Sequence, residues 1–467
     1  MTQGINASDI SYRWQWQLGR LLKKQAEITK DRKKIKKAIA YYTAAVETLN
    51  YVRRDLISIN PDVQFSFRDN VEPLYRELVE LLLQSEPKEE DLKKARDLIE
   101  SLQIAELEDY LRCKLLSKIT VNIDEIVEPS NSTSAIVYPI ILNNQLDIIL
   151  KLPHQSLRHY TTDLSLNDFN NTITQLREKL PDIRTLKQVQ PLSNRLYNWL
   201  IQPIEADLKN SNAETLVFVL DGDLRNIPMA VLYDGQKYLI EKYAIALTPS
   251  LQLFDPKPLE RRGIKALISG ITEPVDGFSR LDHVNEELKK IKSQVSSKIL
   301  LNEDFTSLAL EEQIKSRPFS IVHLATHGQF SSQLEETFIL AWNKRINTNE
   351  LSSILRTRGE NLPKAIELLV LSACKTGTGD KRAVLGLAGI AVRADARSTV
   401  GSLWSAYDES TTALMSRFYN ELVNNPITKA EALRRAQLYL LKEPGFELYL
   451  TNQVPLGLTA TGQNARA

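Results

Sequence analysis

Hydrophobic residues in the first quarter of the chain recur with the period of a helix. From Tyr12 to Leu22, and again from Ile35 to Val52, apolar residues recur at spacings of three or four positions, which places them on one helix face. In the second stretch small and aromatic side chains alternate, so it can pack closely against another helix. The pattern predicts a helical domain over residues 1–120 with helices within 12–22, 35–52, 67–85 and 89–116.

The first two of these helices resemble one tetratricopeptide unit. Leu18 and Gly19 in the first helix, with Ala38, Tyr42 and Ala45 in the second, carry the resemblance. A solenoid of such units needs about three repeats to bury its faces, so a single unit fits either of two arrangements. The helices form a groove that binds a partner protein, or they are a plain helical cap.

The hydrophobic pattern changes after the helical domain. Residues 121–134 are polar and rich in residues that break regular structure, which indicates a linker. Residues 135–142 and 146–152 are rich in Ile, Val and Leu and are separated by three polar residues, which predicts a β-hairpin. The other elements expected in this segment, bounded at 135–260, are helices near 165–180 and 191–208 and a continuous apolar strand at 215–221.

Strands and helices alternate over residues 261–467. This alternation predicts a mostly parallel sheet with helices on both faces, and ligands of such sheets bind at the carboxyl ends of the strands. The predicted fold class is therefore α+α/β, with an N-terminal helical region followed by an α/β domain. The expected strands are 266–271, 298–302, 321–328, 338–342, 367–374 and 398–404. The expected helices are 283–296, 306–316 and 384–394, followed by two long helices near the C-terminus.

The composition lowers the weight of several classes of protein. The 467 residues carry 59 Lys and Arg against 58 Asp and Glu, a formal charge of +1, so there is no overall basic excess to bind nucleic acid or an anionic membrane. Two cysteines, Cys113 and Cys374, cannot build a disulfide framework or a four-cysteine zinc site. The polar N-terminus and the lack of a long apolar run favour a cytoplasmic location.

Two of the predicted strands end in reactive side chains. One ends in His327-Gly328 and the other in Cys374, and parallel strands place these ends on the same edge of the sheet. A histidine base beside a cysteine lowers the pKa of the thiol and produces the thiolate nucleophile that acyl transfer needs. We interpret His327 and Cys374 as a catalytic pair, with the amides of Gly328 and Cys374 as an oxyanion hole.

Neighbouring residues have alternative interpretations. A cysteine at the end of an apolar strand, such as Cys374, is usually a small buried hydrophobic residue. We interpret the other cysteine, Cys113, as structural because it lies inside a predicted helix. His323 is either a buried neighbour of His327 or a residue that orients it. Gly377 and Gly379 fit neither the dinucleotide fingerprint nor the P-loop, so we interpret them as the rim of a substrate cleft.

Acidic residues follow the last predicted strand, at Asp408 and Glu409. An acidic group at this edge selects a basic side chain of a substrate, or it simply marks the start of a helix. We assign Asp408 and Ser372 to a substrate pocket. The sequence has neither an H-E-x-x-H motif nor a third ligand set, so no metal and no cofactor are expected.

Five segments of the chain together carry a resemblance to a known family. They are HLATHGQF at 323–330, LSACKTGTGD at 371–380, residues 386–422, KAEALRRAQLYLL at 429–441 and residues 216–250. They resemble the CHAT domain, a family of caspase-like cysteine peptidases that is related to separases and commonly fused to tetratricopeptide repeats; residues 216–250 resemble its first part. The histidine precedes the cysteine by 47 residues here and by about 50 in caspases.

The resemblance implies a cysteine endopeptidase that cleaves a protein substrate. It implies that His327 is the general base, that Cys374 is the nucleophile and that Gly328 lends an amide to the oxyanion. It also implies that Asp408 belongs to the primary specificity pocket, and that a protein partner bound by the helical region gates the protease. Neither nucleic acid nor a membrane is expected as a partner.

The C-terminal segment departs from the family pattern. The family usually ends in a segment rich in tyrosine and tryptophan that forms a last strand, but no tryptophan follows Trp404 here. The departure predicts that the last strand is missing or replaced. Two other functions stay open: a catalytically silent scaffold whose helices bind a partner, and a nucleotide-binding switch, which the failure of both phosphate motifs disfavours.

Overall fold

The computed structural model of the chain divides into two compact units. Unit 1 comprises Met1–Lys118 with Ser156–His159, and unit 2 comprises Ile119–Gln155 with Tyr160–Ala467. The predicted linker at 121–134 lies outside the described residues except for its last two positions. The described residues are 2–59, 71–84, 86–112, 115, 133–253, 259, 263–331, 333–357, 365–372, 375–376, 383–402, 408–442 and 456–458.

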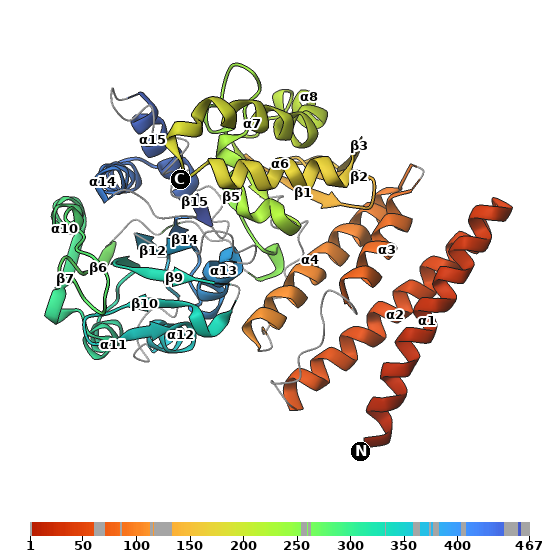
Figure 1. The fold of residues 1–467 in the computed structure, drawn as a ribbon, viewed down its shortest axis with the longest axis horizontal. Coiled ribbons are helices and arrows are strands. Elements are labelled where there is room, and N and C mark those ends of the chain that lie inside the picture. The colour runs from red at the N-terminus through yellow and green to blue at the C-terminus, as the bar shows by residue number, and fades with distance from the viewer. Residues whose placement is uncertain are drawn as a thin grey trace. The chain divides into compact units, whose positions relative to one another are not determined.

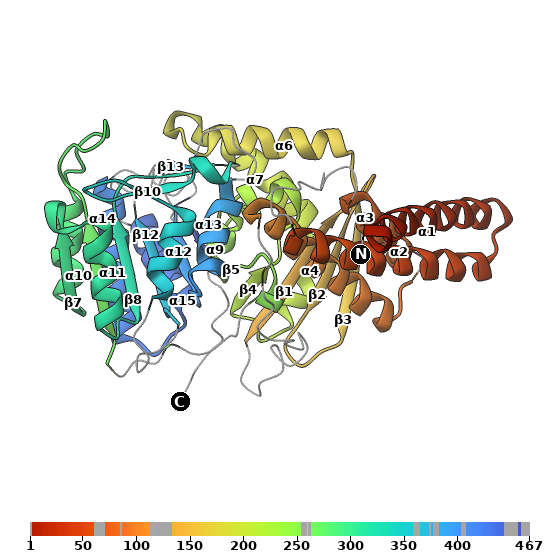
Figure 2. The same ribbon diagram turned by 90° about the horizontal axis from the view of Figure 1, so that it is seen from below.

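The N-terminal part of unit 1 folds into helices that pack side by side. The first two helices lie along each other in both views (Figures 1 and 2). Gly19 on the first faces the ring of Tyr42 on the second, and a Cβ atom at Gly19 would lie 2.8 Å from that ring. The predicted close packing of this helix against another is thus confirmed. The helices are α1 (Thr2–Thr29), α2 (Arg32–Ile59), α3 (Glu72–Leu83) and α4 (Glu89–Leu111).

One carboxylate connects three of these helices. Glu77 on α3 accepts hydrogen bonds from Trp16 Nε1 at 3.0 Å, from Arg20 Nε at 2.9 Å and from the Tyr42 hydroxyl at 2.7 Å. Burial alone would raise the pKa of Glu77, but the hydrogen bonds outweigh it and lower that pKa below its ordinary value. The ionised carboxylate therefore stabilises the packing of α1 and α2 on α3.

The first sheet of unit 2 contains the predicted hairpin. β1 and β2 pair antiparallel, with Tyr138 opposite Ile149, while β4 pairs parallel with β1 and β5 pairs parallel with β4. The hairpin prediction is confirmed. The order is β3-β2-β1-β4-β5, with β1 (Ser134–Ile141), β2 (Gln145–Lys151), β3 (Leu157–Asp163), β4 (Thr215–Phe218) and β5 (Ala244–Leu247). The helices of this part are α6 (Leu166–Lys179), α7 (Leu186–Leu200), α8 (Glu205–Lys209) and α9 (Leu239–Lys242).

The second sheet of unit 2 is the predicted parallel sheet. Its neighbours β7, β6, β8, β12 and β14 are all parallel, and β15 pairs antiparallel with β14 at one edge, with Gly457 opposite Val400. Of the two expected alternatives, a missing or a replaced last strand, the structure has the second: a strand without tryptophan takes that place. The strands are β6 (Lys265–Gly270), β7 (Ser296–Leu301), β8 (Ile321–Ala325), β12 (Leu368–Ser372), β14 (Thr399–Gly401) and β15 (Leu456–Leu458).

Helices cover both faces of the parallel sheet (Figure 1). Val322 and Leu324 of β8 pack in a cluster with α11, α12 and α13, whereas Ile321 and Ala325 pack in another with α10, α14 and α15. This alternation is the side-chain period of a strand. The helices are α10 (Val284–Lys292), α11 (Ser307–Ser316), α12 (Thr348–Arg356), α13 (Ala383–Arg393), α14 (Asp408–Asn424) and α15 (Lys429–Lys442). Within the described part of the chain, no helix combines the length and apolar character needed to cross a membrane.

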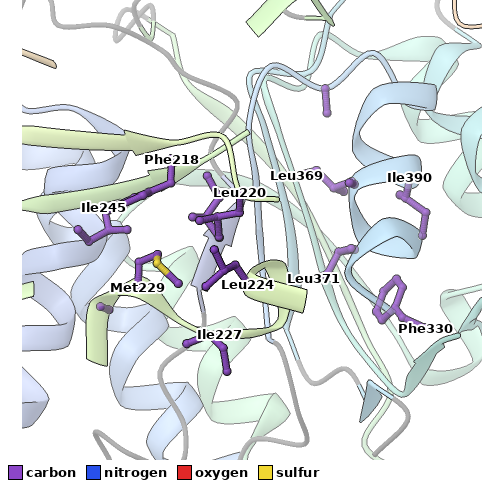
Figure 3. Packing of buried hydrophobic residues seen from close by; sticks show 14 of the residues in the cluster. Phe218, Leu220, Leu224, Ile227, Met229, Ile245, Phe330, Leu369, Leu371 and Ile390 are labelled. Atoms are coloured by element: carbon purple, nitrogen blue, oxygen red, sulfur yellow. The ribbon is translucent and has the colours of Figure 1, made fainter. Parts of the chain in front are cut away.

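One hydrophobic core connects the two sheets of unit 2. Phe218 of the first sheet belongs to the same cluster as Leu369 and Leu371 of the second (Figure 3). A shared core makes the segments predicted at 135–260 and 261–467 one compact unit.

A third sheet of four short strands follows the end of β8. Its order is β11-β10-β9-β13. β9 begins at Gly328, directly after His327, and β13 pairs parallel with it. β9 follows β8 and β13 follows β12, so the small sheet begins where these two parallel strands end. Its strands are β9 (Gly328–Phe330), β10 (Phe338–Leu340), β11 (Arg345–Asn347) and β13 (Lys375–Thr376).

Candidate active site

His327 lies on the short connection between β8 and β9 and is partly exposed. Its Nε2 atom lies 2.7 Å from the carbonyl oxygen of Ser279. A carbonyl oxygen only accepts hydrogen bonds, so this nitrogen carries a proton and donates it. In the neutral ring the other nitrogen, Nδ1, then holds the lone pair. The ring is thus arranged to accept a proton at Nδ1.

The loop between β6 and α10 supports the histidine ring. Phe278 stacks on His327 with ring centroids 4.9 Å apart and an interplanar angle of 29°. Asp276 and Gly277 have φ angles of 53° and 79°, and the Phe278 amide donates to the Val275 carbonyl at 2.9 Å. An Asp-Gly pair is preferred where two successive turn residues need positive φ. The tight turn therefore presents Phe278 to the imidazole.

Arg345 of β11 holds this turn against the four-stranded sheet. Its guanidinium pairs with Asp276 and lies over the Phe338 ring, 4.6 Å from the centroid. Phe338 in turn contacts Phe278 edge to face, with centroids 6.1 Å apart. These contacts connect the support of the histidine to the small sheet.

Cys374 lies outside the described residues, but the chain on both sides of it is described. Ser372 pairs with Ala325 between β12 and β8. Lys375 pairs with Gln329 between β13 and β9. These partners lie two residues before and two residues after the candidate base. The described residues on either side of Cys374 are therefore paired with residues on either side of His327.

Ser372 is not at a surface. Its side chain is 1% exposed, and its Oγ donates to Oε1 of Glu287 at 2.9 Å. The expectation that Ser372 lines a substrate pocket is therefore corrected, because its hydroxyl is buried and engaged by a buried carboxylate.

His323 is fully buried between α10 and α14. Its Nδ1 lies 3.2 Å from the Tyr419 hydroxyl. Its Nε2 lies 3.0 Å from Oε1 of Glu287, although the direction of approach is not that of a hydrogen bond. Burial, followed by the charge of Glu287, raises the pKa of Tyr419 well above its ordinary value, so the phenol keeps its proton. These contacts fit the expected buried neighbour of His327 and show no direct contact that orients it.

The remaining predicted residues are placed only in part. Gly328 begins β9 and is buried, and Asp408 is the first residue of α14, with a side chain outside the description. Cys113, Gly377 and Gly379 also lie outside the described residues. Among the residues that the structure describes, no group of three or more His, Cys, Asp or Glu side chains is arranged to hold a metal ion.

The family model of the CHAT domain matches residues 190–455, more than half of the chain. This chain belongs to the CHAT domain family. The match contains the His-Gly motif at 327–328 and the Ser-Ala-Cys motif at 372–374, and it confirms the resemblance drawn from these segments. The CHAT domain runs from within α7 through the parallel sheet to the edge of β15.

No curated protein matches this CHAT-domain chain in sequence. Among solved structures, the Arg-specific cysteine proteinase gingipain R (RGPB) is similar, with a TM-score of 0.35 and 11% sequence identity. The alignment covers 62% of this chain and 73% of that one.

Two groups of the CHAT domain site were not expected from the sequence. The carbonyl of Ser279 and the ring of Phe278 both contact His327 from the β6–α10 loop. The Asp276-Gly277 pair is a sequence signal for the turn. Nothing in that signal indicates that the turn contacts a histidine about fifty residues later in the chain.

Proposed function

We propose that this CHAT domain is a cysteine endopeptidase with His327 as general base and Cys374 as nucleophile. One observation carries the proposal: Ser372 and Lys375, on either side of Cys374, pair with residues on either side of His327. Only two residues separate Ser372 from Lys375, and consecutive Cα atoms are about 3.8 Å apart, so the chain between these paired positions is short. The Nδ1 lone pair of His327, left by the hydrogen bond to Ser279, supports the role of base.

The proposed reaction proceeds in two balanced halves. Nδ1 of His327 takes the thiol proton of Cys374, and the thiolate forms a bond to the carbonyl carbon of the scissile peptide. The proton then passes to the leaving amine as the C–N bond breaks, which leaves a thioester. Water attacks this thioester, its proton moves to His327, and the C–S bond breaks to regenerate the thiol and release the acid.

Two further assignments belong to this proposal. The backbone amides of Gly328 and Cys374 would stabilise the oxyanion of the tetrahedral intermediates. Asp408, the first residue of α14, would select a basic side chain of the substrate. Protein substrates of this kind need no cofactor for hydrolysis.

Alkylation of the two cysteines against pH tests the dyad without a substrate. Mass spectrometry follows the labelling of each cysteine. We expect Cys374 to be labelled rapidly below neutral pH and this rapid phase to be lost in His327→Ala. Cys113, in the same sample, is the internal control for thiol reactivity. Slow labelling of Cys374 with a midpoint near the free-thiol value of about 8.5, unchanged in His327→Ala, would contradict the proposal and favour a silent scaffold.

Peptide hydrolysis tests the reaction itself. Cys374→Ala should abolish cleavage of an unfolded protein or a peptide library, with little change in thermal stability, because only one sulfur atom is removed. Cys113→Ala is the matched control and should cleave like the wild type. If Cys374→Ala still cleaved the wild-type substrate, the nucleophile would be misassigned.

A second candidate function, partner binding by the helical region, is favoured by an apolar stripe on α1. The stripe is strongly exposed: Trp14 is 71% exposed and Ile28 is 76% exposed. Its members recur at spacings of three, four or seven residues, so they share one helix face. They are Ile10, Trp14, Leu18, Leu21 and Ile28.

Charge indicates the chemistry of this partner. Between residues 12 and 37, ten Lys and Arg stand against two Asp and Glu, so the stripe lies in a strongly basic segment. We infer that the partner presents an amphipathic helix with apolar residues on one face and acidic residues beside it. Such a partner would gate the protease or, in a silent protein, be held by the scaffold.

Two synthetic helices test this surface on the full chain. One carries Leu at helical spacing with Glu between, and the other carries Lys in place of Glu. Calorimetry should show binding of the Glu helix only, weakened at least tenfold by Trp14→Ser but not by Tyr51→Ser, an exposed aromatic of α2 outside the stripe. Equal binding of both helices, or no effect of Trp14→Ser, would contradict the inference.

A further inference from the structure

Four polar side chains form a cluster inside the CHAT domain. Glu287 of α10, His323 of β8, Ser372 of β12 and Tyr419 of α14 are each at most 1% exposed. The proposed reaction uses none of them. Burying a carboxylate costs free energy of folding unless other polar groups compensate it. We therefore ask which function the cluster serves.

A single oxygen atom of this cluster contacts two neighbouring strands. Oε1 of Glu287 accepts the hydrogen bond of Ser372 at 2.9 Å and lies 3.0 Å from Nε2 of His323. The Tyr419 hydroxyl lies on the other side of the imidazole, 3.2 Å from Nδ1. Glu287 of α10 therefore links β12, through Ser372, to β8, through His323. The Tyr419 hydroxyl contacts His323 of β8 and is not part of this link.

The two strands that this oxygen links are those that lead to the proposed dyad. His323 precedes His327 by four residues, and Ser372 precedes Cys374 by two. Backbone pairing in the same place is sparse: β8 ends at Ala325, and the Thr326 amide reaches the Ser372 carbonyl at 3.3 Å. The side-chain link thus lies where the regular sheet gives way to the site.

Close packing of α10 on the sheet brings the carboxylate within reach. A Cβ atom at Gly270 of β6 would lie 2.7 Å from Cγ1 of Val284 and 3.0 Å from Cδ1 of Leu288. Glycine at this position therefore lets α10 approach more closely than any other residue would permit. On the same helix face, between Val284 and Leu288, Glu287 is directed at the strands.

We propose that Glu287 is a positioning residue of the CHAT domain, whose Oε1 holds the ends of β8 and β12 in the relative position that the proposed dyad needs. The inference rests on the proposed dyad and adds to it a residue on another element. Glu287 acts through Ser372 and His323, the two residues that its Oε1 contacts among the described part of the chain.

A pair of matched variants separates this role from plain core packing. Ser372→Ala removes one buried hydroxyl and with it the hydrogen bond between β12 and Glu287. Tyr419→Phe also removes one buried hydroxyl of the cluster but leaves both Glu287 contacts. At pH 6.5 we expect alkylation of Cys374 to slow about tenfold in Ser372→Ala, with a midpoint raised toward about 8.5, and to stay within threefold of wild type in Tyr419→Phe.

A double-mutant cycle tests whether Glu287 and Ser372 act as one unit. Glu287→Met removes the carboxylate and retains much of the volume. We expect it to slow labelling as Ser372→Ala does, and the double variant to be no slower than either single variant. Melting temperatures measured in parallel identify folded variants, and Ser372→Ala alone decides the matter if Glu287→Met does not fold.

The outcomes distinguish the two proposals. If wild-type Cys374 labels rapidly and depends on His327, but Ser372→Ala behaves like Tyr419→Phe, the positioning role is overturned and the dyad stands. Independent effects that multiply in the double variant also overturn it. If wild-type labelling is slow and does not depend on His327, the dyad fails and the positioning role fails with it.

Discussion

Nε2 of His327 donates a hydrogen bond to the carbonyl oxygen of Ser279 at 2.7 Å, across 48 residues of chain. This contact selects one tautomer of the neutral ring, because the acceptor has no proton to give. It also leaves the lone pair of the neutral ring on Nδ1. The chemical role that we propose for His327 depends on this orientation.

The tautomer of His327 is open to direct measurement. In the neutral ring we expect the proton on Nε2 and the lone pair on Nδ1, which the nitrogen-15 shifts of histidine-labelled protein distinguish. His327→Gln assigns the signal by its loss. A ring protonated on Nδ1 in the neutral state would contradict the contact with Ser279.

Loss of the ring beside the histidine should reduce the reactivity of the thiol. Phe278→Ala removes the ring that stacks on His327, and such aromatic contacts contribute about 0.5–1.5 kcal/mol. We expect alkylation of Cys374 at pH 6.5 to slow roughly two- to tenfold. Tyr439→Ala, which removes an exposed aromatic of α15, is the control and should have no effect. Equal rates in wild type and Phe278→Ala would show that stacking does not orient the base.

A buried lysine should make the free energy of unfolding of unit 2 depend on pH in the alkaline range. Burial lowers the pKa of Lys429 to about 8 although nearby Glu367 opposes the shift, and Arg397 adds to it. Nζ donates to the Glu367 carbonyl and to Ser398 Oγ. Between pH 8 and about 10.4 the unfolded chain binds more protons than the folded one, so the free energy of unfolding rises with pH in this window.

Denaturant unfolding of Lys429→Met measures this contribution. Relative to the variant, we expect wild type to gain about 3 kcal/mol in the free energy of unfolding between pH 7.5 and 10.5. Other titrating groups are common to both proteins and cancel in the difference. Parallel pH curves for the two proteins would contradict the shifted pKa.

The Glu77 carboxylate should dominate the local stability of unit 1. Glu77→Gln weakens contacts with Trp16, Arg20 and Tyr42, whereas Glu80→Gln affects one ion pair with Lys23. We expect hydrogen exchange in α1 and α2 to report a loss of about 1–3 kcal/mol for Glu77→Gln and under about 1 kcal/mol for Glu80→Gln.

Acid should remove the same contribution in wild type. Because hydrogen bonds hold the pKa of Glu77 below its ordinary value despite burial, its contribution is present above the unfolded pKa of about 4.3. It is lost as the pH falls through the folded pKa. Protection of α1 and α2 that decreases on acidification in wild type, but not in Glu77→Gln, would confirm the assignment.

Local patterns predicted most elements of this protein. The three- and four-residue spacing of Tyr12, Tyr42 and their neighbours is the period of a helix, and α1 and α2 form there. Alternation of apolar runs and helices predicted the parallel sheet, which the pairing of β6, β7, β8, β12 and β14 confirms. The last strand was harder to predict, since Leu456–Leu458 is short and lies at the edge of the sheet, paired with β14.

Hydrophobic period and motif order are properties of nearby residues, so they predicted that His327 and Cys374 follow two apolar strands. The family match contains both residues. That the two strands are neighbours is seen only in the pairing of β8 with β12. Long-range contacts in the folded chain likewise show what holds the imidazole and where the Ser372 hydroxyl points. The Ser279 carbonyl and the Glu287 carboxylate are 48 and 85 residues from their partners. Glu287 does interrupt the apolar face of α10, which signals a buried polar contact, but no local pattern names a partner that folding brings from so far along the chain.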